Sequence, residues 1–234
     1  WCMFDYNTHK DFGSGDRVCY HGVLDLFRNP KLAANIYACE QEQTPVLEIT
    51  SSMDIGEHPG CNRGNLYILS NADSVRMYKN DRFIKEYRPE MSPYKHLKHG
   101  PILIDDFIGD CFEKNERFKP KHAKQMVDAM NLVARGSLNH IPKRLYLTAL
   151  KLALIYHLDF DEVSKLYTKY IGDWGGTATV YRFDAIKNGN VVKSVTKEPV
   201  MDLQLSAKAD HTRLYEHHSY DVALVRIEAQ DSHG

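Results

Sequence analysis

Apolar and polar positions change their period several times along the chain. Residues 1–7 are aromatic and apolar, typical of a buried strand in a parallel sheet, and residues 8–21 carry the glycines and aspartates of a loop. Over 28–43 the apolar spacing predicts a helix capped by Asn29, with Pro30 in its first turn. Its predicted apolar face holds Leu32, Ile36 and Cys39. The chain therefore begins as strand, long loop and helix, a single β/α unit.

Short β-rich segments with alternating polarity come next. They occupy 45–87, return at 177–196, and continue beyond Pro199 as two more predicted strands. Asn80–Asp81 and Asn188–Gly189 lie between alternating runs, where they predict the tight turns of two hairpins. Short antiparallel strands at this spacing indicate an immunoglobulin-like sandwich.

A helical block separates the two groups of β segments. The first predicted helix starts near Pro120 and ends before Gly136, and the second starts at Pro142. The third starts at Asp159, which forms a capping box with Glu162. The predicted apolar faces hold Ala123, Met126, Val127, Met130 and Val133 in the first helix, and Leu145, Leu147, Leu150, Leu152, Leu154 and Ile155 in the second. Three such helices predict a small bundle inserted into the sandwich.

These patterns predict a mixed, mainly β fold. The expected parts are 1–43 (β/α unit), 44–111 (first part of the sandwich), 112–173 (helical insertion), 174–199 (last hairpin of the sandwich) and 200–234 (start of a further β domain). A lone β/α unit cannot bury both faces of its strand, and two strands are too few for an independent β domain. We therefore expect the chain to be a piece of a longer protein.

Composition narrows the classes of partner. The 234 residues carry a net charge of −1, so they lack the basic footprint of a protein that binds nucleic acid or an anionic membrane. There is no apolar run of bilayer-spanning length. The five cysteines form no CxxC motif and no disulfide framework, which favours reduced thiols and a cytoplasmic location. We expect no cofactor and no metal.

Few residues suggest chemistry on their own. The motifs GxSxG, HExxH, the P-loop and GxGxxG after a strand are all absent. Asp105–Asp106 could act as an acid/base pair, although a loop or capping role at the entrance to the helices fits as well. His96 with His99, and His217–His218, could bind a metal, but neighbouring histidines in basic loops are usually solvated.

The first residues offer the clearest binding candidates. Trp1 lies near Asp5, Asn7 and His9, and an aromatic face beside such polar groups is typical of a sugar site. A plain core tryptophan is the alternative reading of Trp1.

A family resemblance favours the sugar site. WCMFDYNTHKDFGSGDRVCYHGVLDLFRNPKLAANIY closely resembles the final β/α unit of the catalytic barrel in glycoside hydrolase family 2, which includes β-galactosidases, β-glucuronidases and β-mannosidases. The matching elements are Trp1, Gly15–Arg17, Gly22–Val23 and Arg28–Lys31. NLYILSNADSVRMYKNDRFIKEY and FDAIKNGNVVKSVTKEP resemble the immunoglobulin-like domain that follows that barrel. The helices from about 112 to 171 have no counterpart in this resemblance.

The resemblance implies a C-terminal fragment of a β-galactosidase-like enzyme. Such enzymes retain configuration with two carboxyls about 5 Å apart. In the family both are glutamates on earlier barrel strands, so this chain is expected to have no catalytic residue and to be inactive alone. Asn115–Glu116 mimics the family's Asn-Glu pair but follows the last barrel strand, so we reject it.

The resemblance also suggests where sugar binds. Trp1 would form the floor of the −1 subsite, and Asp5, Asn7, His9 and His21 would lie near its rim, within the complete barrel of the parent. Family glucuronidases carry Asn-x-Lys where this chain has Cys19-Tyr20-His21, which argues against a glucuronide. A neutral β-galactoside is favoured because it is frequent in the family, and homo-oligomerisation stays open.

Two other function classes compete. A non-catalytic carbohydrate-binding or scaffolding sandwich would need a row of exposed aromatics, which Tyr67, Tyr78, Tyr87 and Tyr181 could supply. A protein–protein adaptor would expose an apolar patch on the helical block.

Overall fold

The computed structural model describes residues 2–8, 17–53, 63–116, 118–136, 142–172, 179–199 and 202–233. Over these residues the chain is mainly β with a few helices, as the sequence predicts. Of the helices in this described part, none is long and apolar enough to cross a membrane.

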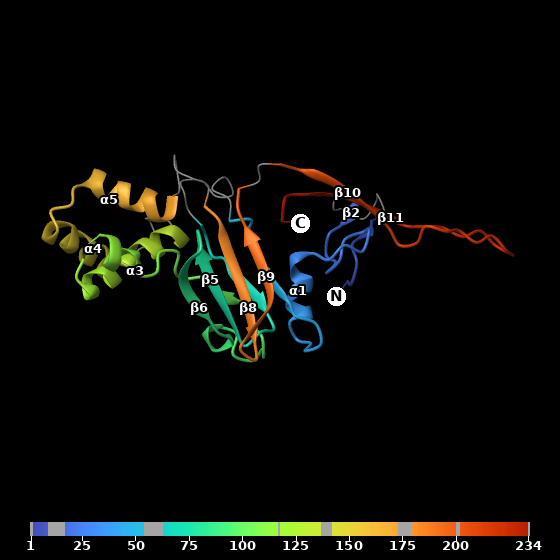
Figure 1. Cartoon of the computed structure of the whole chain (residues 1–234), viewed down its shortest axis with the longest axis horizontal. Helices are drawn as coiled ribbons and strands as arrows, with labels where there is room; N and C mark the ends of the chain where they lie inside the picture. Colours follow the sequence, from blue (N-terminus) through green and yellow to red (C-terminus); the bar gives the residue numbers. More distant parts are fainter. Residues whose placement is uncertain are drawn as a thin grey trace.

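Two antiparallel sheets make up the centre of the molecule (Figure 1). One has the strand order β3-β4-β7 and the other the order β6-β5-β8-β9. Their bounds are β3 Leu47–Ile49, β4 Tyr67–Ser70, β7 Ile102–Leu103, β5 Ser74–Lys79, β6 Arg82–Tyr87, β8 Tyr181–Lys187 and β9 Asn190–Lys197. All neighbouring strands in both sheets run antiparallel.

The two sheets share one hydrophobic core. Ile49 and Ile68 reach it from the first sheet, and Met77, Phe183 and Ala185 reach it from the second. These side chains come from alternate positions of their strands, because successive residues of a strand point to opposite faces. Burying each of the larger ones stabilises the fold by about 1.5–3 kcal/mol relative to leaving it exposed.

Both predicted hairpins are confirmed. Asn80 and Asp81 have φ of 48° and 60° between β5 and β6, and Asn188 and Gly189 have φ of 52° and 78° between β8 and β9. Positive φ at both central residues defines the type I′ turn, whose twist matches that of the flanking strands. Asn and Asp tolerate this conformation better than other non-glycine residues.

Most of the helices lie between β7 and β8 in the chain and at one side of the β6-β5-β8-β9 sheet (Figure 1). They are α2 Cys111–Asn115, α3 Pro120–Gly136, α4 Lys143–Ile155, α5 Phe160–Tyr167 and the π-helical turn η5 Thr168–Gly172; a short 3₁₀ turn, η3 Pro89–Met91, precedes β7. The predicted capping box of α5 is present, with Asp159 and Glu162 bonding each other's backbone N–H. The predicted inward face of α3 is buried except at Val133, which is half-buried.

Helix α4 differs from the expectation. Of the six residues predicted for its apolar face, only Leu152 is buried. The described residues that pack on α4 cover only one side of the helix. Its apolar residues extend beyond that side, so most of them are exposed.

The N-terminal part, residues 2–8 and 17–38, also differs. The expected buried parallel strand over 1–7 is wrong: β1 is only Tyr6–Asn7, it is exposed, and it pairs antiparallel with β2, Val18–Cys19. A strand buried on both faces needs neighbouring strands and covering helices, and in the described residues this segment has only the pairing with β2 and a parallel bridge from Phe4 to Leu24. We call residues 2–8 and 17–38 the N-terminal segment.

The helix of this segment is shorter than expected. Helix α1 spans Leu32–Ala38, with Lys31 as its N-cap. Asn29 does not cap it, because Pro30 forms a β-bridge with Leu24 and the Lys31 N–H donates to the Val23 carbonyl at 3.1 Å, so the chain is still extended at Lys31. On the predicted face Cys39 is fully buried, whereas Leu32 and Ile36 are exposed.

Two final strands form a separate ribbon. β10 (Gln204–Ala209) and β11 (Val225–Gln230) pair antiparallel, and Figure 1 shows the ribbon reaching away from the two sheets. The register sorts the side chains by polarity. One face holds Leu205, Ala207, Ala209, Val225, Ile227 and Ala229, and the other holds only polar and charged residues.

Candidate functional site

Asp5 is the centre of the N-terminal segment. Its Oδ1 accepts a hydrogen bond from the Gly22 backbone N–H at 2.8 Å and lies 2.6 Å from the ammonium of Lys31. The Asp5 side chain is 2% exposed, whereas that of Lys31 is 30% exposed. Burying a carboxylate is costly unless a charge and hydrogen bonds compensate it, and both are present here. Asp5 therefore joins β1 to the start of α1.

Gly22 lets the backbones meet at this point. A Cβ on Gly22 would lie 2.2 Å from Asp5 N, 2.3 Å from Phe4 C and 2.4 Å from Leu24 O. Real Cβ atoms do not approach backbone atoms this closely, so any side chain here would force the strands apart. Sequence reasoning placed Gly22 and Lys31 in the family-like pattern without giving either a role.

The other predicted sugar-contacting residues are placed differently. Trp1 and His9 lie outside the described residues. Asn7 is exposed on β1, and His21 is exposed just after β2, with its Nδ1 3.1 Å from Cys19 Sγ. The buried Asp5 is thus engaged by its own fold, whereas Asn7 and His21 face solvent. The assignment of all five residues to a sugar site stays a prediction.

The paired carboxylates Asp105 and Asp106 take structural roles. Asp105 accepts two hydrogen bonds from the Lys85 ammonium, at 2.7 and 2.9 Å. Asp106 Oδ1 accepts from the backbone N–H groups of Ile108 and Gly109, both at 2.9 Å. The two carboxylates therefore hold a loop, which agrees with the loop or capping alternative.

Glu116, in the Asn-Glu pair rejected above, is likewise occupied. It accepts from the ammonium of Lys169 and from the hydroxyl of Tyr170. Burial acts to raise the pKa of Glu116, but these two donors outweigh it, and the pKa lies below its usual range. An acid/base catalyst needs the opposite, a carboxyl pKa raised towards neutrality.

The histidine and tyrosine candidates are also accounted for. Among the residues that the structure describes, no three His, Cys, Asp or Glu side chains are grouped as metal ligands. His217 and His218 are exposed. Tyr87 and Tyr181 are fully buried, so the four tyrosines do not form the exposed row that a carbohydrate-binding sandwich requires.

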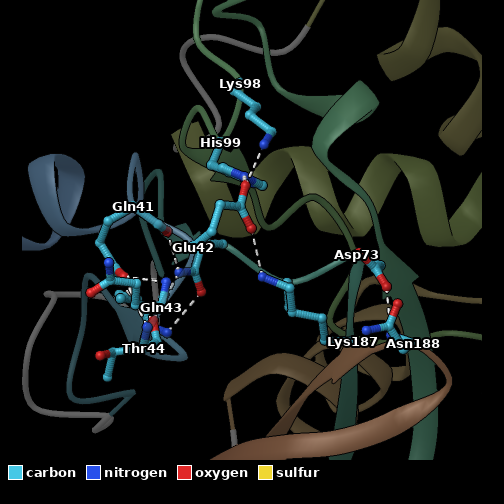
Figure 2. Close-up of polar contacts among 12 residues, drawn as sticks. Gln41, Glu42, Gln43, Thr44, Asp73, Lys98, His99, Lys187 and Asn188 are labelled. Carbon is cyan, nitrogen blue, oxygen red and sulfur yellow. Dashed lines mark hydrogen bonds and ion pairs between the residues drawn. The ribbon is translucent and has the colours of Figure 1, made fainter.

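A cluster that the sequence did not indicate lies where the N-terminal segment joins the sheets (Figure 2). Glu42, in the link between α1 and β3, binds Lys187 Nζ at 2.6 Å, His99 Nε2 at 3.1 Å and the ammonium of Lys98. The hydrogen bond from Lys187, followed by those from Lys98 and His99, holds the pKa of Glu42 well below its usual range. We call Glu42, Lys98, His99 and Lys187 the junction cluster.

Asn71 fixes the same link from the other side. Its Oδ1 accepts from Val46 N at 2.8 Å, and its Nδ2 donates to the carbonyls of Gln41 and Thr44, at 2.7 and 2.9 Å. Asn71 is 2% exposed, so these bonds form away from water. Gln41 also folds back, donating to the Thr44 carbonyl and accepting from the Gln43 and Thr44 N–H groups (Figure 2). The link over 41–46 is therefore a rigid connection.

Less than half of the chain is similar in sequence to the known proteins compared below. No protein-family model matches the chain. Over 108 residues, 45% of the chain, it is 44% identical to a β-galactosidase from Thermoanaerobacterium thermosulfurigenes. Over 105 residues it is 41% identical to a β-galactosidase from Thermoanaerobacter pseudethanolicus. Over this stretch the chain is similar to β-galactosidases.

The likeness covers only part of each relative. The matched regions span 15% and 14% of the lengths of the two β-galactosidases. A crystal structure of a β-glycosidase from Bacteroides vulgatus has a similar fold, with a TM-score of 0.53 over 99% of this chain and 20% of that chain. At 12% identity that structure shows a likeness of fold alone. The chain thus matches a small part of larger enzymes.

Proposed function

We propose that this chain is a C-terminal part of a retaining β-glycosidase of glycoside hydrolase family 2 that removes terminal β-galactosides. The observation that carries the proposal is the 44% identity with a β-galactosidase over 108 residues. In this proposal the chain alone is inactive, because the catalytic glutamate pair belongs to barrel strands that precede Trp1.

The three carboxylates that the sequence singles out, Asp105, Asp106 and Glu116, support the proposal that the chain alone is inactive. A retaining glycosidase needs two carboxyl groups about 5 Å apart and free to reach the sugar. Asp105 is held by Lys85, Asp106 by backbone N–H groups, and Glu116 by Lys169. None of the three is placed to act as a nucleophile or a general acid.

The domain division is part of the proposal. Residues 1–43 would be the last β/α unit of the catalytic barrel, and 44–111 with 174–199 an immunoglobulin-like sandwich carrying the helical insertion 112–173. The strand orders β3-β4-β7 and β6-β5-β8-β9 around one core support the sandwich. The one-sided apolar face of β10 and β11 supports a further β domain from 200 onward, because a two-stranded ribbon is marginally stable alone.

Within the complete enzyme, the chain would present the −1 subsite and hold it in place. Trp1, Asn7, His9 and His21 are the proposed sugar contacts. Asp5 is also proposed near the sugar, and its bonds to Lys31 and Gly22 hold the segment that carries the other contacts. The junction cluster and Asn71 would fix this last barrel unit on the sandwich. A rigid support matters because small displacements of a binding group from its productive position reduce activity strongly.

Hydrolysis of nitrophenyl β-galactoside, β-glucuronide and β-mannoside tests the proposal. The purified chain should release no nitrophenol above background, whereas the longer protein that contains it should hydrolyse the β-galactoside. Turnover by the chain alone would place a carboxylate pair within these residues and refute the assignment of the catalytic groups. A longer protein that prefers the glucuronide or mannoside would refute the assignment of the sugar.

A further inference from the structure

Helix α4 exposes an unusual amount of apolar surface. Leu147 is 63% exposed, Leu150 50% and Leu154 70%. Tyr146 and Ile155 on the same helix are exposed as well. Single exposed leucines are normal on protein surfaces, but contiguous apolar side chains on one helix mark an interaction site.

The exposed residues form ridges of the kind that pack against another helix. Tyr146, Leu150 and Leu154 are four residues apart, so they line up along α4 as one apolar ridge. Lys143, Leu147, Lys151 and Ile155 form the neighbouring ridge at the same spacing. The face therefore has an apolar strip beside a strip in which lysines alternate with apolar residues. We call the seven residues of these two ridges the α4 face.

The charges of the α4 face are uncompensated. The sequence of α4 contains no aspartate or glutamate, and Lys143 and Lys151 are exposed and form no ion pair with any described residue. Of the three carboxylates that follow α4 most closely in the sequence, Asp159 and Glu162 bond backbone N–H groups at the start of α5, and Asp161 forms no ion pair with Lys143 or Lys151. The described part of the chain thus supplies no acidic partner to this face.

We propose that the α4 face docks an acidic amphipathic helix of a partner protein. Leucines of that helix would fill the groove between the two ridges, and carboxylates would pair with Lys143 and Lys151. A second copy of this chain fits poorly, because two α4 helices would bring lysines together without any acidic residue between them. An anionic membrane fits poorly too, because lipid-binding clusters hold four to eight basic residues on or beside one helix, more than the α4 face provides.

A labelled peptide tests the docking directly. The probe is a synthetic helix of about 15 residues, long enough to be partly helical alone, with leucines at heptad a and d positions and glutamates beside them. Fluorescence anisotropy with the full chain should show saturable binding that weakens as salt is raised. A matched peptide with lysines in place of glutamates should bind at least tenfold more weakly.

Variants of the chain locate the site. Leu150→Glu should weaken binding at least tenfold, whereas Phe160→Ser, which removes an 85% exposed apolar side chain from α5, should leave it unchanged. Lys151→Glu should weaken binding of the acidic peptide and strengthen binding of the lysine peptide. This charge swap stays informative if Leu150→Glu disturbs α4, which circular dichroism would report.

Three results would overturn the proposal. The first is no saturable binding of the acidic peptide, and the second is equal binding of both peptides. The third is occupancy by something else: self-association in sedimentation velocity that Leu150→Glu abolishes, or binding to anionic phospholipid vesicles that Lys151→Glu abolishes. Because none of these measurements uses glycosidase activity, they succeed or fail independently of the proposed function.

Discussion

The Lys31 ammonium lies 2.6 Å from the Asp5 carboxylate, and the two residues are 26 positions apart in the sequence. Lys31 also donates to the Tyr20 carbonyl at 3.1 Å, so a single side chain ties β1, the residues after β2 and the start of α1 together. The N-terminal segment is therefore held together in part by this polar contact, whereas the two sheets are held together by their shared hydrophobic core.

Removing the lysine should therefore loosen the segment. Lys31→Met leaves the buried Asp5 carboxylate with one donor, Gly22 N–H, and should lower the free energy of local unfolding by about 1–3 kcal/mol. Hydrogen exchange at the Gly22 amide measures this opening. The double variant Asp5→Asn with Lys31→Met should be less destabilised than Lys31→Met alone, because no buried charge remains. Equal exchange rates in wild type and Lys31→Met would contradict this role.

Gly22 and Gly189 make a matched pair for a second prediction. Gly22→Ala would press a methyl group against three backbone atoms and should cost about 3 kcal/mol or more. Gly189→Ala meets nothing within 4 Å, and only its φ of +78° is unfavourable, which costs about 1–2 kcal/mol. Urea unfolding monitored by hydrogen exchange separates the two: Gly22→Ala should release the N-terminal segment, and Gly189→Ala the β8–β9 hairpin. If Gly22→Ala lowered stability less than Gly189→Ala, the backbones around Gly22 would have moved apart to accommodate the methyl group, which would contradict the prediction.

The junction cluster should make stability depend on acidity. The pKa of Glu42 in the folded chain lies well below its unfolded value of about 4.5, because Lys187, Lys98 and His99 bond its carboxylate. A lowered folded pKa contributes stability above the unfolded pKa, and that contribution is lost as the pH falls towards the folded pKa. Wild type should therefore unfold at higher urea than Glu42→Gln at neutral pH, and the gap should shrink below about pH 4.5.

Two controls sharpen this comparison. Glu48 has only one lysine partner among the described residues, Lys197 at 3.2 Å, whereas Glu42 has three basic partners. Glu48→Gln should therefore change the urea midpoint less than Glu42→Gln. Raising the salt concentration should narrow the gap for Glu42→Gln, because the cluster is partly exposed. A gap that stays constant from neutral to acidic pH would show that the Glu42 charge has no part in it.

Local patterns were predictable from the sequence where short-range chemistry decides the structure. Asn188–Gly189 specifies its turn through the φ angles that these residues tolerate, and Asp159 with Glu162 caps α5 within one helical turn. The start of α1 differs from the prediction because Pro30 and Lys31 pair with Leu24 and Val23, a contact that the local pattern does not show, and α1 begins at Leu32 instead.

The contacts that build the candidate site were less predictable. Glu42 meets Lys98, His99 and Lys187 across separations of 56, 57 and 145 residues. No periodicity or motif links residues that far apart, and only the folded topology brings them together. The sequence also predicts a longer and more buried strand than β1, because burial on both faces depends on neighbours elsewhere in the fold.

Asn71 provides the last prediction. Asn71→Ala removes three hydrogen bonds and leaves the Val46 N–H and the Gln41 carbonyl without their side-chain partner, whereas the Thr44 carbonyl keeps the Gln41 amide; the loss should destabilise the chain by about 2–3 kcal/mol. Asn71→Asp keeps the acceptor for Val46 N–H but turns a carboxylate towards two carbonyl oxygens, so it should be no better than alanine. Urea unfolding measures both variants, and hydrogen exchange at Val46 N–H reports the link itself. If Asn71→Asp matched wild type, the two carbonyls would not depend on the amide, and the link over 41–46 would be held by Gln41 and Glu42 instead.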